Sequence, residues 1–197
     1  MARPREFDED LALERAMDVF WRQGYQATST DDLMEAMGIG RGSFYNTFGS
    51  KRKVYLRTLD MYLDVLEEGG PYRMLREMEP GGKALQALLG SYLESVGSDT
   101  GNHGCYFVHV AKEHRGADPE IQKAIRVGVA RMKAILTDHM KIAQGQGILP
   151  EHIEPSQAAL LMMAVAWGSH VLLEAGVEQD EAMSAARVVF DMGREPV

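Results

Sequence analysis

The chain of 197 residues has a single cysteine, Cys105, and no hydrophobic run long enough to suggest a membrane span. One cysteine excludes an intramolecular disulfide and is typical of a reducing compartment. The longest apolar stretch, residues 158–173, is shorter than the run of about 20 apolar residues that a transmembrane helix needs. The charged N-terminus lacks the apolar core of a secretory signal. These absences predict a cytoplasmic protein with no membrane partner.

Catalytic and metal-binding patterns are also missing. The sequence has no G-x-S-x-G or H-E-x-x-H motif and no constellation of paired carboxylates suited to acid–base catalysis. His103, His109, His114 and Cys105 do not follow a compact ligand spacing. We therefore expect a protein that is not an enzyme, with no catalytic residue, no metal site and no cofactor.

Positive charge is scarce: 21 Lys and Arg stand against 29 Asp and Glu, a net charge of −8. Such a charge argues against a general nucleic-acid binder, because phosphate groups attract cations. The acids are unevenly placed, however: residues 1–60 hold nine basic and ten acidic side chains, and residues 61–197 hold twelve and nineteen. Residues 36–59 contain no acid but five cations, namely Arg41, Lys51, Arg52, Lys53 and Arg57. This acid-free window is the candidate surface for contact with a polyanion.

Hydrophobic residues recur with a helical period along the whole chain, and no segment has a convincing strand pattern. Glycines and prolines break the pattern at Gly24, at residues 38–40 and at residues 69–71. We predict an all-α fold of about nine helices. The break near residue 70 divides it into an N-terminal domain, residues 1–66, and a larger helical domain, residues 67–197.

Residues 29–48 have the pattern of two short helices joined by a glycine-containing turn, which is typical of a helix-turn-helix. Ser29 and Asp32 resemble a capping box at the start of the first helix. The second helix would turn Phe44 inward and present Ser43 and Asn46 outward. Short hydrogen-bonding side chains of this kind read base edges in a major groove.

The stretches YQATSTDDL (25–33) and MGIGRGSFYNTFGSK (37–51) closely resemble the N-terminal signature of the TetR family of transcriptional regulators. The family pattern has a T-T-x-x-x-I helix start, an A-G-V-S-x-G-T-x-Y turn and recognition helix, and an F-x-S/N-K ending. The resemblance covers roughly residues 8–66. Two positions depart from the pattern: Gly40 replaces the usual Ser or Thr cap, and Thr47 stands where the family often has His.

The resemblance implies a three-helix DNA-binding domain followed by an effector-binding and dimerisation domain. It implies a homodimeric repressor that binds a near-palindromic double-stranded operator and is released by a small-molecule effector. The resemblance does not distinguish a repressor from an activator. The DNA-binding residues so implied are Ser29, Thr30, Arg41, Gly42, Ser43, Tyr45, Asn46, Thr47 and Lys51. Tyr45 and Lys51 match the phosphate-contacting positions of the family.

Two sets of residues are candidates for the functions of the second domain. The candidate effector pocket contains adaptable methionines, aromatic rings and polar side chains, namely Tyr62, Met78, Tyr92, Cys105, His109, Met132, Met163 and Trp167. The candidate dimer interface lies in the last two helices and consists of Ala159, Met162, Ala166, His170, Ala182, Ala186 and Val189. The first of these two helices is apolar on every face, so we expect it to be covered on every face.

Two alternatives remain open at this point. Cys105 follows Gly104 at an expected helix start, where a thiolate would be stabilised, so the protein can be a redox- or electrophile-sensing regulator. A buried apolar thiol is the simpler interpretation of the same residue. The second alternative is a helical small-molecule-binding protein that has no DNA function.

Overall fold

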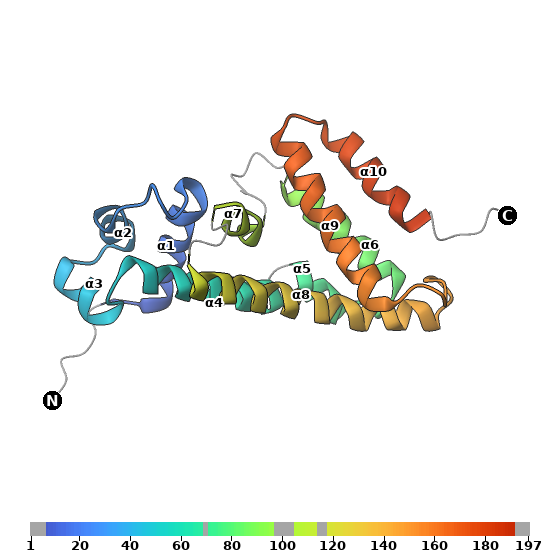
Figure 1. The fold of residues 1–197 in the computed structure, drawn as a ribbon, viewed down its shortest axis with the longest axis horizontal. Helices are drawn as coiled ribbons and strands as arrows, with labels where there is room; N and C mark the ends of the chain where they lie inside the picture. The colour runs from blue at the N-terminus through green and yellow to red at the C-terminus, as the bar shows by residue number, and fades with distance from the viewer. Residues whose placement is uncertain (1–6, 69–70, 97–104, 114–117, 192–197) are drawn as a thin grey trace. The chain divides into compact units, whose positions relative to one another are not determined.

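The computed structural model describes residues 7–68, 71–96, 105–113 and 118–191, which form ten helices and no strand (Figure 1). The helices are α1 (Glu9–Gln23), α2 (Thr30–Met37), α3 (Arg41–Thr47), α4 (Lys51–Glu68), α5 (Pro71–Glu77), α6 (Gly82–Val96), α7 (Tyr106–Glu113), α8 (Pro119–Gly145), α9 (Pro155–Glu174) and α10 (Gln179–Asp191). The predicted all-α class is confirmed.

Helix α5 is the element that the sequence prediction of about nine helices missed. The sequence was interpreted as a break at residues 69–71, but α5 begins at Pro71. Proline is well tolerated at the first position of a helix, because the N–H that it lacks would have no partner there. The same residue that ends one helical pattern therefore also starts the next helix.

The chain forms two compact units, and each is discontinuous in sequence. The first consists of Met1–Asp64 with Tyr106–Gly128, and the second of Val65–Cys105 with Val129–Val197. Helix α7 and the first residues of α8 are thus part of the unit that contains α1, α2 and α3. The sequence-based boundary between residues 66 and 67 stays a prediction.

An aromatic cluster explains why α7 belongs to the first unit. Tyr106 of α7 is 1% exposed, and its ring centroid lies 5.4 Å from Trp21 of α1 and 5.6 Å from Tyr62 of α4. Its hydroxyl lies 3.1 Å from Oγ1 of Thr58, so the buried phenol has a hydrogen-bond partner. Burial raises the pKa of Tyr106 well above its usual range. Rings from three sequence segments therefore share one core.

Gly128 of α8 lies where no larger side chain fits. A Cβ at this position would be 2.4 Å from Cζ of Phe107, which is fully buried and cannot move aside. We expect Gly128→Ala to lower the free energy of unfolding by about 1–3 kcal/mol, as overpacked cores do. Urea denaturation followed by circular dichroism measures this.

Gly90 of α6 provides the matched control, because a Cβ there would meet no atom within 4 Å. Gly90→Ala should be neutral or stabilising by about 0.5–1 kcal/mol, since alanine is the better helix former. Equal unfolding free energies for the two variants would contradict the packing at Gly128.

In the second unit, α10 packs against both α6 and α9, and α5 packs against α6 (Figure 1). Helix α9 buries one face, which includes Ala159, Met162 and His170, but its opposite face is exposed. Within one subunit this helix is therefore covered on one face only, and the expectation that every face is covered stays a prediction. By length and hydropathy α9 could also cross a membrane, although a single helix of this kind is weak evidence for a span.

The predicted interface positions in α9 and α10 face the interior of the unit. Ala159, Met162, His170, Ala182 and Ala186 are each at most 5% exposed, and Ala166 is half-buried. The side chain of Val189 lies outside the described residues. A side chain that is already buried has no surface left to cover with a second chain. The exposed apolar face of the same helices is the surface that a second chain can still cover.

Candidate nucleic-acid interface

Helix α2 begins with the capping box expected from the sequence. Oγ of Ser29 accepts a hydrogen bond from the N–H of Asp32 at 3.0 Å, and the Asp32 carboxylate accepts one from the N–H of Ser29 at 2.7 Å. These hydrogen bonds hold the pKa of Asp32 below its usual value. The side chains of residues 29 and 32 thus fix the point at which the supporting helix starts.

The turn between α2 and α3 depends on glycine. Gly38 has a φ of 68°, the left-handed conformation that glycine adopts without strain, and Ile39 fills the corner with 9% of its surface exposed. Gly40 precedes α3 and makes no side-chain cap. The departure from the family pattern at this residue thus leaves the helix start in place.

Helix α3 has distinct inner and outer faces. Phe44 is 0% exposed and Phe48, just after the helix, is 3% exposed, so these two rings attach α3 to the unit. Tyr45 is 43% exposed. The other residues on the outer face are Arg41, Gly42, Ser43 and Asn46, which are exposed, and Thr47, which is partly exposed. The structure brings the predicted recognition residues together on one surface.

A shallow depression borders this outer face. It has a volume of about 450 Å³ and is lined by Tyr45, Asn46, Thr47, Phe48, Gly49, Lys53, Leu56 and Arg57. Its walls therefore come from the end of α3, the short connection after it and the first two turns of α4. The surface offers hydroxyl, amide and cationic groups to whatever lies against α3.

Lys51, at the start of α4, has partners that the sequence did not reveal. Its Nζ donates to the carbonyl oxygen of Thr28 at 2.6 Å and lies 4.4 Å from the ring centroid of Tyr25. An ammonium group has three donors, so this hydrogen bond does not exhaust its capacity. The α1–α2 loop thus orients the cation that the family resemblance assigns to phosphate contact.

Two of the five cations in the acid-free window are neutralised by acids from elsewhere in the sequence. Arg52 donates to both carboxylate oxygens of Asp118, at 2.6 and 2.8 Å, and also pairs with Glu120. Arg57 pairs with Glu9 at 3.1 Å. The Arg52 guanidinium holds the pKa of Asp118 well below its usual range. The basic surface is therefore narrower than the sequence count suggested.

Glu113 of α7 is a further residue of this unit that sequence reasoning missed. Its carboxylate accepts hydrogen bonds from the backbone N–H groups of Tyr25 and Gln26, at 2.7 Å each. No local signal could have found this contact, because its partners lie 87 and 88 residues away in the sequence.

The predicted effector-pocket residues are divided between the two units. Tyr62 and His109 belong to the first unit, whereas Met78, Tyr92, Cys105, Met132, Met163 and Trp167 belong to the second. Cys105, Met132 and Met163 are at most 4% exposed. Burial raises the pKa of the Tyr92 phenol well above its usual range. The pocket itself stays a prediction.

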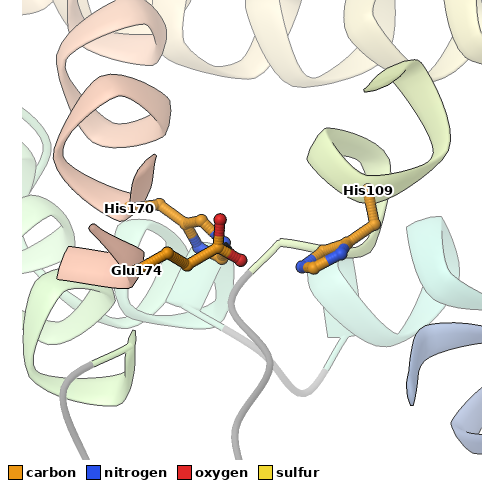
Figure 2. Close-up of side chains that lie close together, drawn as sticks. All are labelled: His109, His170 and Glu174. Carbon is orange, nitrogen blue, oxygen red and sulfur yellow. Dashed lines mark hydrogen bonds and ion pairs between the residues drawn. The ribbon is translucent and has the colours of Figure 1, made fainter. Parts of the chain in front are cut away.

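Figure 2 shows His109, which lies on α7, and His170 and Glu174, which lie one turn apart on α9. Nε2 of His170 is 3.0 Å from Oε1 of Glu174, and the histidine is 1% exposed. Protein metal sites generally use three or four side-chain ligands, and α9 supplies two here. The absence of a metal site stays a prediction, and His103 and His114 lie outside the described residues.

Comparison with known proteins identifies the family. Residues 12–58 match the family described as "Bacterial regulatory proteins, tetR family", and residues 81–189 match the "Tetracyclin repressor-like, C-terminal domain". The chain belongs to the TetR family of transcriptional regulators. This TetR-family chain is therefore a DNA-binding transcriptional regulator, and the first match includes the helix-turn-helix of α2 and α3.

Relatives and solved structures agree with this assignment. The HTH-type transcriptional repressor ComR of Escherichia coli (strain K12) is 25% identical over 99% of this chain and 93% of its own length. The HTH-type transcriptional regulator YezE of Bacillus subtilis (strain 168) is 34% identical, and the match covers 62% of this chain and 63% of YezE. A cysteine-substituted form of the TetR-family regulator CifR, complexed with a 26-bp operator DNA, has a TM-score of 0.82 and 27% identity over 98% of this chain and 100% of that one.

Proposed function

We propose that this TetR-family regulator is a cytoplasmic homodimeric repressor that binds a near-palindromic DNA operator and is released by a small-molecule effector. The observation that carries the proposal is the outer face of α3. It presents Arg41, Ser43, Tyr45 and Asn46 together, with no acid between residues 36 and 59. A short helix of this composition fits a major groove of DNA.

The outer residues of α3 divide by chemistry. Ser43, Asn46 and Thr47 carry short hydrogen-bonding groups that suit base edges, and Arg41 suits a base edge or a phosphate. Tyr45 of α3 and Lys51 at the start of α4 suit backbone phosphates. Because the rest of the chain is acidic, non-specific attraction to DNA is weak, and discrimination depends on these few contacts.

The exposed apolar face of α9 and α10 is the proposed dimer interface. Leu160, Leu161, Val171, Leu172 and Val188 are each between 42% and 53% exposed. Ala164 and Gly168 are exposed on α9 and lie in the sequence between Leu161 and Val171. Their small size allows a second helix to approach closely. A face of this kind is self-complementary under twofold symmetry, and a twofold dimer matches a palindromic operator.

Release of the operator by an effector requires that effector binding and operator binding weaken each other. The coupling free energy is reciprocal and typically about 1–3 kcal/mol. Helices α4 and α8 each contain residues of both compact units, so they are continuous elements through which the two functions can be linked. The thiol of Cys105 is 3% exposed, so the structure gives no particular support to a redox sensor.

The combined substitution Tyr45→Ala and Lys51→Ala tests the DNA-binding surface. We expect operator affinity to fall at least about 100-fold, because two phosphate contacts are lost, and the slope of log K against log salt to decrease by about 1 for the lysine. The probe is a duplex selected from a random library by the wild-type protein. Fluorescence anisotropy at several salt concentrations measures both quantities.

Lys83→Ala is the matched control, since Lys83 is an exposed lysine of α6 in the other unit. It should leave both the affinity and the salt slope unchanged. Unchanged operator retention by the double variant would refute the proposed surface, and failure of the wild-type protein to enrich any duplex would refute DNA recognition as such.

A further inference from the structure

The α1–α2 loop contains an anion-binding arrangement of backbone amides, and a side chain from α7 occupies it. The N–H groups of Tyr25 and Gln26 converge on the two carboxylate oxygens of Glu113. Gly24, which precedes them, has a φ of 80°, and a Cβ there would lie 3.2 Å from both oxygens. Successive N–H groups in a turn of this kind form a concave anion site, often called a nest.

The contact of Glu113 with this loop is close at both oxygens. Each of its two hydrogen bonds measures 2.7 Å, and each runs from a backbone N–H group to a carboxylate oxygen. Hydrogen bonds to an ionised carboxylate are roughly twice as strong as those between neutral groups. The two bonds join α7 to a loop that lies 87 and 88 residues away in the sequence.

The loop that Glu113 holds also orients the DNA-facing groups. Thr28, three residues after Tyr25, accepts the hydrogen bond from Lys51, and its own Oγ1 donates to the carbonyl of Gly24 at 2.7 Å. The ring of Tyr25 lies beside the Lys51 ammonium. A displacement of this loop would therefore move both groups that position Lys51, as well as the residues that lead into α2.

We propose that Glu113 is a positioning residue for operator binding. It contacts no DNA, but it fixes the α1–α2 loop and thereby Lys51. At its other end α7 follows Cys105, which belongs to the second unit, so the helix joins that unit covalently to the contact. Withdrawal of Glu113 from the nest is then a route by which the effector state lowers operator affinity. This inference rests on the proposed DNA-binding function.

The substitution Glu113→Gln removes the charge at nearly constant size and is the direct test. We expect the backbone amides of Tyr25 and Gln26 to exchange with solvent faster, and operator affinity to fall roughly tenfold, because charged hydrogen bonds are the stronger ones. NMR-detected hydrogen exchange and anisotropy with the selected duplex measure the two effects. Both are recorded well below the unfolding temperature, where loss of stability alone would leave affinity unchanged.

Glu14→Gln is the matched control, because Glu14 is exposed on α1 and the change in net charge is the same. Removal of an acid from the DNA-binding unit should by itself leave affinity equal or slightly higher, since DNA is a polyanion. A loss of affinity in Glu113→Gln thus has the opposite sign from a simple charge effect. The control thus separates the loss of the Glu113 contact from the general electrostatic effect of removing one negative charge from the unit.

The outcomes separate this inference from the proposed function. Slower or unchanged amide exchange, or faster exchange with operator affinity equal to that of the control, would overturn the role of Glu113. If Glu113→Gln does not fold, Glu113→Asp replaces it under the same criteria, because the shorter side chain cannot reach both amides with α7 in place. A wild-type protein that selects no duplex would instead overturn the proposed function.

Discussion

Leu161→Glu combined with Leu172→Glu is expected to convert the proposed dimer into a folded monomer and to abolish tight operator binding. Both side chains lie on the exposed face of α9, at 53% and 47% exposure, so the change should cost little within one subunit. In a dimer, however, each chain would bury two unpaired carboxylates, which costs several kcal/mol per charge. A monomer reaches only one half-site, so the affinity should fall by a factor on the order of 100 or more.

Sedimentation equilibrium gives the oligomeric state, and anisotropy with the selected duplex gives the affinity. Ile142→Glu is the matched control, because Ile142 is 42% exposed on α8 and lies outside the proposed interface. It should remain a dimer with unchanged operator binding. A double variant that stays dimeric would show that the interface lies on another face.

Phe44→Ala is expected to have the largest effect on the DNA-binding unit. The ring is 0% exposed, and its centroid lies 5.3 Å from that of Tyr45 and 6.1 Å from that of Phe48. Removal of a fully buried phenylalanine typically costs about 3–5 kcal/mol, because a cavity remains. Since α3 has only seven residues and cannot form a stable helix alone, loss of this anchor should disorder the recognition helix.

Denaturant unfolding measures the stability, and operator retention at low temperature measures the function. Ser43→Ala changes an exposed neighbour on α3, so it should shift the unfolding free energy by less than about 0.5 kcal/mol. Phe44→Leu keeps most of the buried volume and should recover much of the loss. A Phe44→Ala protein as stable as Ser43→Ala would contradict the anchoring role of the ring.

The helix-turn-helix could be predicted almost completely from the sequence, because its determinants are local. The capping box uses side chains three residues apart, and the turn requires the conformation that only Gly38 adopts easily. The spacing of Phe44 and Phe48 likewise gave the inner face of α3. Each of these features depends on neighbours within one or two helical turns.

The candidate dimer interface could not be predicted in the same way. Helix α9 is apolar on nearly every face, so its sequence carries no amphipathic period that marks one face as internal. The packing of α6 and α10 decides which residues are buried, and it leaves Leu161 and Leu172 exposed while Met162 is covered. The sequence prediction therefore named residues on the buried face of these helices, whereas the interface that we propose lies on their exposed face.

Charge is the clearest case of this division between local and tertiary information. The net charge of −8 and the acid-free window of residues 36–59 are properties of the sequence alone, and the window predicts where the DNA-facing surface lies. The sequence does not show that Asp118 pairs with Arg52, that Glu9 pairs with Arg57, or that Glu113 fills the α1–α2 loop. These partners lie 48 to 88 residues apart, and only tertiary packing brings their charges within hydrogen-bonding distance. Local interactions thus determine the recognition helix, and long-range contacts decide which cations remain available to DNA.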